Sequence, residues 1–363
     1  MSETKKIKLL ILTPTLQCGG SEKFVSLVCQ HINTEIFSVC LIVINNDKPF
    51  YQVPNRAIEI VDLKKDRILF SLPAIKAVVK KYKPAIIFST ANHLNLYLAI
   101  FRNHFDARTQ FIAREGSIVS INNQHAKFPA LYNRLIKKYY KRFDHIVCQS
   151  VYMQQDLVKH YNIAAHKTVV IHNAVEEGLN TAPQPGKGMT DRIYKFITIA
   201  RLSEEKGIER LIHAVGLISV PFNYYIIGEG KKRKELQKLI DALHVKDKIF
   251  LVGEKMNPFR GMEDADLFLF GSYYEGFPNV LPEAGAHGIP VIAFNAPGGI
   301  AEIITGQDMG QLVDDNDIIA FARAIKNGLA ANFNREAIQE ITKARFSMVK
   351  MIAEIQALFM KQK

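Results

Sequence analysis

Short apolar runs alternate with amphipathic stretches along most of this chain. The runs have the length of buried strands, and the stretches between them repeat apolar residues with a helical period. In the first half the predicted strands are Ile7–Thr13, Phe37–Ile44, Ile58–Leu63, Ala85–Ser89, Gln110–Ala113, His145–Cys148 and Thr168–Ile171, with predicted helices at Glu22–Ile32, Leu72–Tyr82 and Leu131–Lys141. This alternation predicts an α/β fold with a doubly wound parallel sheet and helices on both faces.

The alternation stops at residues 176–191, where Gly, Pro and Thr are frequent, and then starts again. The second half predicts strands at Phe196–Ala200, Tyr224–Ile227, Ile249–Val252, Leu267–Phe270 and Val291–Phe294, and helices near Ile208–Leu217, Lys232–Leu243, Val280–His287 and Ile318–Leu329. We therefore predict a hinge between two Rossmann-like domains, residues 1–176 and 177–345. A final helix, Phe346–Met360, has no strand after it.

The composition limits the possible binding partners and the cellular compartment of the protein. The 363 residues carry a formal charge of +12, which predicts an anionic partner: nucleic acid, anionic lipid and nucleotide diphosphate all fit. No run approaches eighteen apolar residues, and the start lacks a signal-peptide cleavage pattern. The cysteines, Cys18, Cys29, Cys40 and Cys148, have no metal or disulfide spacing. We expect a cytoplasmic protein without a membrane span.

The segment EGFPNVLPEAGAHGIPVI, residues 275–292, carries the most chemical information. It follows an apolar strand and predicts a short helix that Asn279 caps, Pro282 enters in its first turn and Gly288 ends. The unpaired N–H groups of such a helix start attract phosphate. Glu275 and Glu283 then flank the anion and can accept hydrogen bonds from sugar hydroxyls. Two glutamates in this position also fit a solvated first turn.

A second loop carries two cations. Arg201 and Lys206 lie between the strand Phe196–Ala200 and the next predicted helix, at the edge of the sheet where open α/β folds bind ligands. Their side chains can neutralise a departing diphosphate without a metal ion. Alone, such a pair is more typical of ordinary surface charges.

Together, the Arg-Leu-(x)3-Lys-Gly loop and the Glu-x7-Glu segment resemble the retaining glycosyltransferases of the GT-B fold, called group 1 or family 4. The resemblance covers nearly the whole chain. It implies two Rossmann-like domains facing across a cleft, with the last helix, residues 346–363, returning to the first. It also implies transfer of a hexose or N-acetylhexosamine from a nucleotide diphosphate sugar, with UDP favoured. The first domain would bind the acceptor and the second the donor.

The resemblance also assigns roles to residues. Arg201, Lys206 and Glu275 would act in catalysis: the cations, with the helix after Asn279, would stabilise the departing diphosphate, and Glu275 would hold the transferred sugar. Glu283 would bind the ribose hydroxyls. The remaining donor-binding residues would be Gly20, Gly230, Gly253, Lys255, Gly276, Phe277, Asn279 and Val280. From the residues alone, Gly20 fits a simple turn equally well, a simple turn is the more frequent explanation for Gly230, and Asn173 is most simply a turn residue.

One departure from the family concerns catalysis. Many members have a histidine after the strand equivalent to Gln110–Ala113, whereas this chain has Arg114, Glu115 and Gly116. We expect Arg114 or Glu115 to take its place on the acceptor side, because His93 and His125 are more typical of surface histidines. The missing histidine leaves two alternatives: an inert sugar-nucleotide binding subunit of a transferase complex, or a sugar-nucleotide epimerase of related fold.

No metal site or cofactor is predicted. Asp264 and Asp266 resemble an Asp-x-Asp metal site but precede a strand instead of following one. Asp314, Asp315 and Asp317 lack the spacing of a cation loop, and Asp317 fits the N-cap of the helix that follows it.

A basic, aromatic stretch in the first domain, Ala126–Phe143, contains no acidic residue. Its cations are Lys127, Arg134, Lys137, Lys138, Lys141 and Arg142. The stretch fits either a solvated helix face or a surface that rests on anionic lipid. No nucleic-acid motif accompanies it. We therefore expect peripheral association with the inner face of a membrane and a lipid-linked saccharide acceptor, in bacterial surface-polysaccharide synthesis such as O-antigen or capsule.

Overall fold

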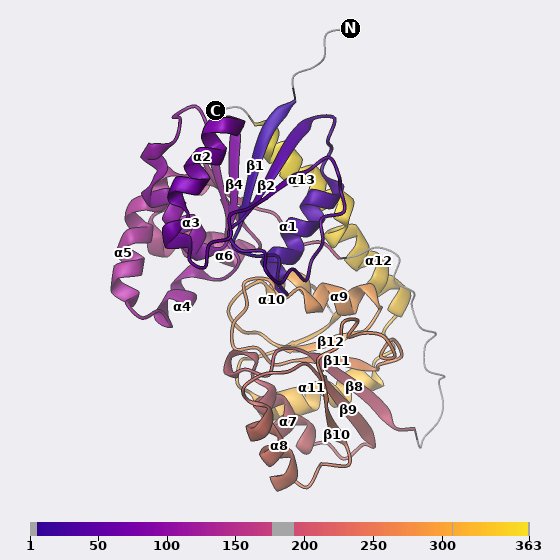
Figure 1. Cartoon of the computed structure of the whole chain (residues 1–363). Helices are drawn as coiled ribbons and strands as arrows, with labels where there is room; N and C mark the ends of the chain where they lie inside the picture. Colours follow the sequence, from indigo (N-terminus) through magenta and orange to yellow (C-terminus); the bar gives the residue numbers. More distant parts are fainter. Residues whose placement is uncertain (1–5, 176–191, 307, 362–363) are drawn as a thin grey trace. The chain divides into compact units, whose positions relative to one another are not determined.

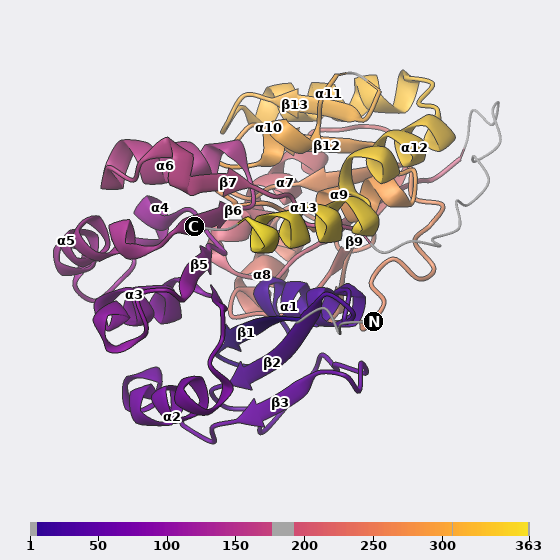
Figure 2. The ribbon, with the colours of Figure 1, turned by 90° about the horizontal axis from the view of Figure 1, so that it is seen from above.

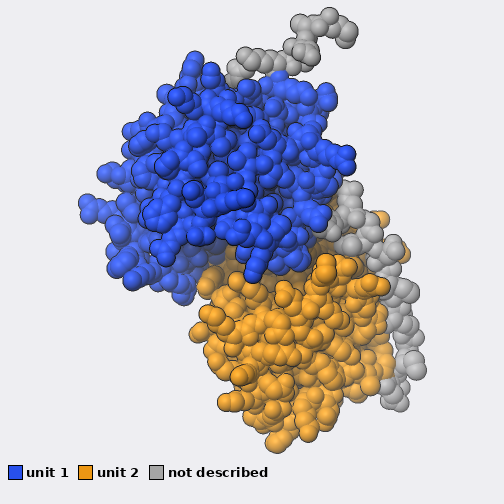
Figure 3. Space-filling view, viewed as in Figure 1, with its two compact units in different colours: residues 1–173, 349–363 blue, residues 174–348 orange. Residues whose placement is uncertain are grey.

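A computed structural model describes residues 6–175, 192–306 and 308–361 of the chain. The chain divides into two compact units (Figure 3). Unit 1 comprises residues 1–173 and 349–363, and unit 2 comprises residues 174–348. The predicted hinge, residues 176–191, lies outside the described residues.

Unit 1 contains a seven-stranded parallel sheet in the order β3-β2-β1-β4-β5-β6-β7; Figure 1 labels β1, β2 and β4 of it, and Figure 2 labels β3, β5, β6 and β7. The strands are β1 Ile7–Thr13, β2 Phe37–Val43, β3 Glu59–Asp62, β4 Ile86–Thr90, β5 Gln110–Arg114, β6 His145–Cys148 and β7 Thr168–Val170. The central strand β1 is apolar and buried from Leu9 to Leu12, as expected for a strand covered on both faces.

Helices cover both faces of this sheet (Figure 2). Helices α1 (Gly20–His31) and α13 (Met348–Met360) lie on one face, and α2 (Leu72–Tyr82), α3 (Asn92–Ile100) and α5 (Pro129–Tyr139) lie on the other. Two further helices are α4 (Val119–Gln124) and α6 (Val151–Tyr161). In α13, Phe359 packs edge-on against Phe37 and Phe88. This contact confirms the predicted return of the C-terminal helix to the first domain.

Unit 2 contains a six-stranded parallel sheet in the order β10-β9-β8-β11-β12-β13. Its strands are β8 Tyr194–Ile199, β9 Phe222–Ile227, β10 Ile249–Gly253, β11 Leu267–Phe270, β12 Val291–Phe294 and β13 Gly310–Val313. Its helices are α7 Ile208–Gly216, α8 Arg233–Ala242, α9 Val280–Ala286, α10 Ile300–Ile303, α11 Ile318–Ala330 and α12 Arg335–Phe346. Separate apolar cores fill the two faces of the sheet. The predicted α/β class is confirmed in both units.

The order of strands marks, in each unit, the point where an open α/β sheet is expected to bind a ligand. In unit 2 the chain runs from β8 towards β10 on one side and from β11 towards β13 on the other. The loops after β8 and β11 therefore diverge between two adjacent strands, which is the point where open α/β sheets bind ligands. In unit 1 the same point lies between β1 and β4.

Candidate active site

The two charged loops predicted from the sequence meet at this point in unit 2. Strands β8 and β11 are paired neighbours, with Phe196 opposite Leu267 and Ile197 opposite Phe268. The loop that contains Arg201 and Lys206 follows β8, and the loop that contains Glu275 follows β11. Both loops therefore leave the same edge of the sheet.

Lys206 and Glu275 form an ion pair across the two loops. The distance between Lys206 Nζ and Glu275 Oε1 is 2.5 Å, and the side chains are 17% and 18% exposed. The hydroxyl of Ser272 also donates to Glu275 Oε1, at 3.0 Å. A partly desolvated pair of this kind has fewer competing water contacts than a surface pair and so holds its side chains in place. The sequence indicated both residues but not their contact.

Gly207 and Arg210 hold the two loops together. Gly207 has a φ of +55°, and a Cβ there would lie 2.0 Å from the carbonyl oxygen of Gly271. The buried guanidinium of Arg210 donates to the carbonyls of Gly271 and Ser272 at 2.7 and 2.6 Å, and to Asp315 Oδ1 at 2.6 Å. Sequence reasoning missed Arg210. The sequence feature that could have indicated Arg210 is a cation on the otherwise apolar face of the helix after Lys206.

Arg201 is placed differently from Lys206. Its side chain is 77% exposed and pairs with Glu205 at 3.2 Å. Partial burial raises the pKa of Glu205, but the hydrogen bond from Ser203 and the charges of Arg201 and Lys206 bring its net pKa below the usual value. The Arg201 guanidinium is thus held on the loop while remaining open to an incoming anion.

Glycines allow the surrounding loops to approach one another. Gly228, with φ +142°, would place a Cβ 2.0 Å from the carbonyl oxygen of Ala200, and Gly230 would place one 2.3 Å from that of Leu202. Gly298, with φ +129°, would place one 1.6 Å from the carbonyl oxygen of Glu275. The Gly228-x-Gly230 motif therefore packs against the Arg201 loop. Its predicted contact with a nucleotide stays a prediction.

The other predicted donor residues lie on neighbouring elements. Gly276, Phe277, Asn279, Val280 and Glu283 lie in the loop after β11 and the first turn of α9. Asn279 occupies the predicted N-cap position of α9, but its backbone is helical, with φ −52° and ψ −32°, and its side chain makes no capping hydrogen bond. Its carbonyl instead accepts from the N–H of Glu283 at 3.0 Å, so the first turn continues through it.

Two predicted donor residues belong to the end of β10. Gly253 is its last residue and has a φ of +92°; its carbonyl accepts from the N–H of Gly228 at 2.9 Å. Lys255 follows and is exposed. In the sheet order, β10 lies two strands from β8, on the side of the sheet away from β11.

In unit 1 the predicted acceptor residues form a buried polar network. Arg114 is the last residue of β5, and both Arg114 and Glu115 are fully buried. Arg114 Nη2 donates to Asn173 Oδ1 at 2.7 Å, and Glu115 Oε1 accepts from Asn95 and Tyr140 at 2.8 and 2.9 Å. Asn173 is thus part of this network and not only a turn residue.

The network is incompletely satisfied. Among the described residues, Arg114 Nε and Nη1, and Glu115 Oε2, have no hydrogen-bond partner. Burial, opposed by the Asn95 and Tyr140 hydrogen bonds, raises the pKa of Glu115 to about 7. Burial lowers the pKa of Arg114 to about 9. Buried groups with perturbed pKa values are typical of functional sites. By contrast, His93 and His125 are exposed.

A strained residue lies beside this network. Ala91 follows β4, has a φ of +119°, and its N–H points to the carbonyl of Arg114 at 3.5 Å. A non-glycine residue in this conformation stores strain of about 1–3 kcal/mol, which is found at functional sites more often than elsewhere. Gly20, at the start of α1, is exposed at the same edge of the sheet, after β1.

The aspartates resembling metal sites make structural contacts. Asp264 pairs with Lys195 at 2.5 Å, and Asp266 pairs with Arg192 and accepts from the N–H of Lys195 at 2.8 Å, at the amino end of β11. Asp317 accepts from the N–H of Ala320, which confirms it as the N-cap of α11. Across the described residues, no group of three or more His, Cys, Asp or Glu side chains is arranged to hold a metal ion.

The basic stretch of unit 1 has an exposed apolar side. In α5 and the residue before it, Phe128 is 56% and Leu131 52% exposed. Lys127, Arg134, Lys137, Lys138 and Lys141 are exposed too. Arg142 does not share this exposure, because its guanidinium donates to the carbonyls of Ala99 and Ile100 at 3.2 and 2.9 Å, at the end of α3.

No helix in the described ranges is long and apolar enough to cross a membrane.

Comparison with known families gives matches in both halves. The family described as "Glycosyl transferases group 1" matches residues 185–345, and the one described as "Glycosyltransferase Family 4" matches residues 18–178. The chain is also 27% identical over 358 residues to N-acetylgalactosamine-N,N'-diacetylbacillosaminyl-diphospho-undecaprenol 4-alpha-N-acetylgalactosaminyltransferase of Campylobacter jejuni. That match covers 95% of this chain and 97% of the relative.

Solved structures share the fold. The lipopolysaccharide outer core galactosyltransferase WaaB has a TM-score of 0.78 with 16% identity, and the match covers 97% of this chain and 99% of WaaB. HepE of Anabaena, solved in complex with UDP, has a TM-score of 0.79 with 19% identity, covering 98% of this chain and 99% of HepE. At these identities the likeness concerns the fold, which is the two-domain GT-B fold that the sequence predicted.

Proposed function

Because the chain belongs to the group 1 glycosyltransferases of the GT-B fold, we propose that it transfers a hexose or N-acetylhexosamine from a UDP-sugar to a lipid-linked saccharide, with retention at the anomeric carbon. The observation that carries this proposal is the Lys206–Glu275 pair, which joins the two motif loops at the switch point of the unit 2 sheet.

The cations of the Arg201–Lys206 loop stabilise the departing UDP. Negative charge develops on the diphosphate as the bond between the anomeric carbon and the phosphate oxygen breaks. Lys206 donates from a partly buried position, and Arg201 from an exposed one. Preorganised donors aimed at developing charge are usually the largest contribution to catalysis. Glu275 accepts from hydroxyls of the transferred sugar, and Glu283 accepts from the ribose of the nucleotide.

Retention follows a front-face route. The acceptor hydroxyl forms a bond to the anomeric carbon on the side from which UDP departs. Its proton passes to an oxygen of the leaving phosphate, so no enzyme carboxylate needs to form a covalent bond. The reaction uses no metal or other cofactor, because Lys206 and Arg201 supply the positive charge that the diphosphate requires.

The acceptor is a lipid-linked saccharide of bacterial surface-polysaccharide synthesis. Support comes from the Campylobacter jejuni relative, whose name specifies a diphospho-undecaprenol acceptor, and from WaaB, whose name specifies lipopolysaccharide. The UDP complex of HepE supports UDP as the nucleotide. The exposed cations and apolar side chains around α5 hold the enzyme at the cytoplasmic face of the membrane.

A donor screen tests the proposal. The purified chain is incubated with UDP- and GDP-sugars and a bacterial lipid extract, and both the lipids and the nucleotides are analysed by mass spectrometry and chromatography. A glycosylated lipid formed from a UDP-sugar is the expected result. Epimerised donor without transfer would identify an epimerase, and donor binding without turnover an inert subunit; either outcome would overturn the proposal.

A further inference from the structure

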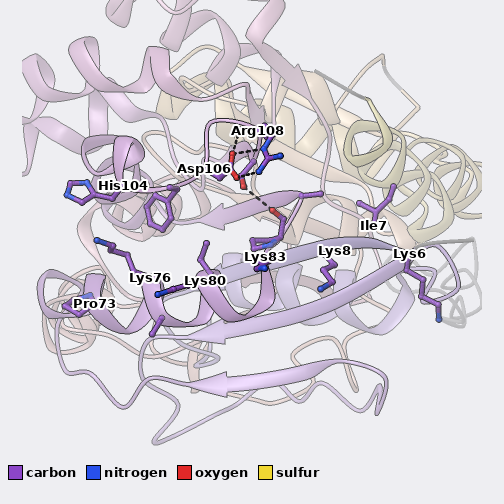
Figure 4. A pocket seen from close by; sticks show the side chains of 16 residues that line it. Lys6, Ile7, Lys8, Pro73, Lys76, Lys80, Lys83, His104, Asp106 and Arg108 are labelled. Carbon is purple, nitrogen blue, oxygen red and sulfur yellow. Dashed lines mark hydrogen bonds and ion pairs between the residues drawn. The ribbon is translucent and has the colours of Figure 1, made fainter.

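A pocket lies at the edge of the unit 1 sheet opposite Gly20 and Arg114 (Figure 4). It has a volume of about 1010 Å³. Its walls are the starts of β1, β4 and β5, the side of α2, and the loop that precedes β5. Because all seven strands are parallel, their starts lie at the edge remote from the loops that open α/β folds use for substrates.

The lining of this pocket is strongly basic. Its charged residues are Lys6, Lys8, Lys76, Lys80, Lys83, Arg108 and Asp106. The single carboxylate is neutralised locally, because Asp106 Oδ2 accepts from Arg108 Nη2 at 2.7 Å. The positive charge of the lysines is therefore left without compensation from within the pocket.

Three of these lysines are unpaired. Lys76 and Lys80 of α2, and Lys83 directly after it, are exposed, and no described residue forms an ion pair or side-chain hydrogen bond with them. Lys8 differs, since its ammonium donates to the carbonyl of Tyr82 at 3.0 Å. Lys76 and Lys80, four positions apart, lie on one side of α2. Lys83 caps the end of the helix in a left-handed conformation, with φ +53°, and Figure 4 shows all three lysines along the pocket, with His104 across from Lys76.

A helix dipole accounts for only part of this arrangement. Lysines in the last turn of α2 interact favourably with the negative end of the helix dipole, whichever side of the helix they lie on. Lys6 and Lys8, however, belong to the start of β1, and Arg108 precedes β5, so the dipole does not explain why cations from three elements line one cavity. Like charges at this spacing repel one another until an anion binds.

We propose that this pocket binds a phosphate-bearing ligand with at least two negative charges, at a site separate from the one that holds the donor. Ammonium groups bind phosphate as point charges, and several around one cavity favour a multiply charged anion. The ligand is either a soluble phosphate compound or the headgroup of an anionic lipid. Pro73 lines the pocket, and Leu69 and Phe70, shortly before it in the sequence, are 67% and 62% exposed, so they are available to contact the apolar part of a lipid.

The test compares two triple variants. The pocket variant carries Lys76→Gln, Lys80→Gln and Lys83→Gln; the control variant carries Lys234→Gln, Lys238→Gln and Lys246→Gln, which remove the same charge from exposed positions in unit 2. Both are made in a Lys206→Ala background, so that binding of phosphate at the donor site does not contribute. Calorimetry with inorganic pyrophosphate and flotation with phosphatidylglycerol vesicles give two independent measurements.

We expect the pocket variant to bind at least one of these probes ten-fold or more weakly than the control variant. Loss of pyrophosphate binding identifies a soluble ligand. Loss of vesicle binding alone, with a similar loss in Leu69→Ser/Phe70→Ser, identifies a lipid headgroup. If both probes bind equally to the pocket and control variants, or bind to neither, the proposal is wrong.

Discussion

The ammonium of Lys206 and the carboxylate of Glu275 lie 2.5 Å apart although 69 positions separate them in the sequence. The contact exists because β8 and β11 are neighbours in the sheet, so that the loops after them leave the same edge. An ion pair that is mostly removed from water holds both groups in one orientation. We infer that incoming donor meets a preformed site and not two mobile side chains.

The backbone of Glu275 depends on a glycine across the site. Gly298 has φ +129°, and its Cβ position lies 1.6 Å from the Glu275 carbonyl oxygen. Gly298→Ala should therefore lower the free energy of unfolding by about 2–3 kcal/mol, through strain and displacement of the Glu275 loop. It should also lower transfer activity more than stability alone explains, which chemical denaturation and steady-state kinetics would measure.

Gly306→Ala is the matched control for this substitution. Gly306 also has a positive φ, +78°, but its Cβ position meets no atom of the described, non-adjacent residues within 4 Å. Gly306→Ala should lower the free energy of unfolding by about 1 kcal/mol, because of the backbone conformation alone. Equal losses in both variants would show that the Glu275 contact has no effect of its own.

The buried Glu115 predicts a stability that depends on pH. Burial raises its pKa from 4.5 to about 7, so the folded state binds the proton more tightly than the unfolded state. This stabilisation is complete below about pH 4.5 and is lost as pH rises to 7. Glu115→Gln keeps the side chain neutral. Its free energy of unfolding relative to the wild type should therefore rise by on the order of 3 kcal/mol over this interval.

Denaturation at a series of pH values measures this difference. Glu340→Gln, at an exposed position of α12, is the control and should follow the wild type across the same interval. Curves for Glu115→Gln and wild type that run parallel from pH 4.5 to 7 would contradict the assignment of a raised pKa to Glu115.

The C-terminal helix should contribute to the stability of unit 1. Phe359 is 2% exposed, and its ring lies 5.2 Å from that of Phe88 and 6.0 Å from that of Phe37. Phe359→Ala should lower the free energy of unfolding by about 3–5 kcal/mol, as is typical when a buried phenylalanine is replaced by alanine. Val349→Ala, on the same helix but 72% exposed, should change the free energy of unfolding by less than about 0.5 kcal/mol. Similar effects of the two substitutions would argue against this packing.

The sequence predicts the strands correctly where they are buried and bounded by turn residues. The bounds of Ile7–Thr13, His145–Cys148, Leu267–Phe270 and Val291–Phe294 agree with the structure. Strand β13 was missed because Gly310–Val313 is a short edge strand that begins with a glycine and has only two apolar side chains. Helix α3 was missed because it is almost entirely buried, so it lacks the alternation of apolar and polar residues that marks a surface helix.

The candidate site could be predicted from the sequence only in part. Charged residues after two strands located Lys206 and Glu275, because parallel strands bring such loops to one edge. Their ion pair depends on side-chain geometry that spacing does not specify. Arg210 escaped notice because a cation on an apolar helix face resembles a surface residue until the carbonyls that it binds are known. The burial of Arg114 likewise depends on Asn173, which is 59 positions away.

The basic side of α5 should bind anionic membranes. Replacing Arg134, Lys137 and Lys138 by glutamine should weaken binding to phosphatidylglycerol vesicles by about 3 kcal/mol at low salt, at about 1 kcal/mol for each cation. Flotation at low and high salt measures this, and the Lys234/Lys238/Lys246 triple serves as the control. Wild-type protein that binds neutral vesicles equally well, or stays unbound at low salt, would show that these cations form only a solvated face.

The most direct test of the central claim is the turnover number of Lys206→Ala with a saturating UDP-sugar donor and lipid-linked acceptor. Loss of one charge-stabilising donor predicts a fall of about 10²-fold or more, near 3 kcal/mol. Lys234→Ala, in α8, should turn over as the wild type does, and thermal unfolding would show that both variants are folded. Lys206→Ala that turns over at the wild-type rate would contradict the assignment of this site to sugar transfer.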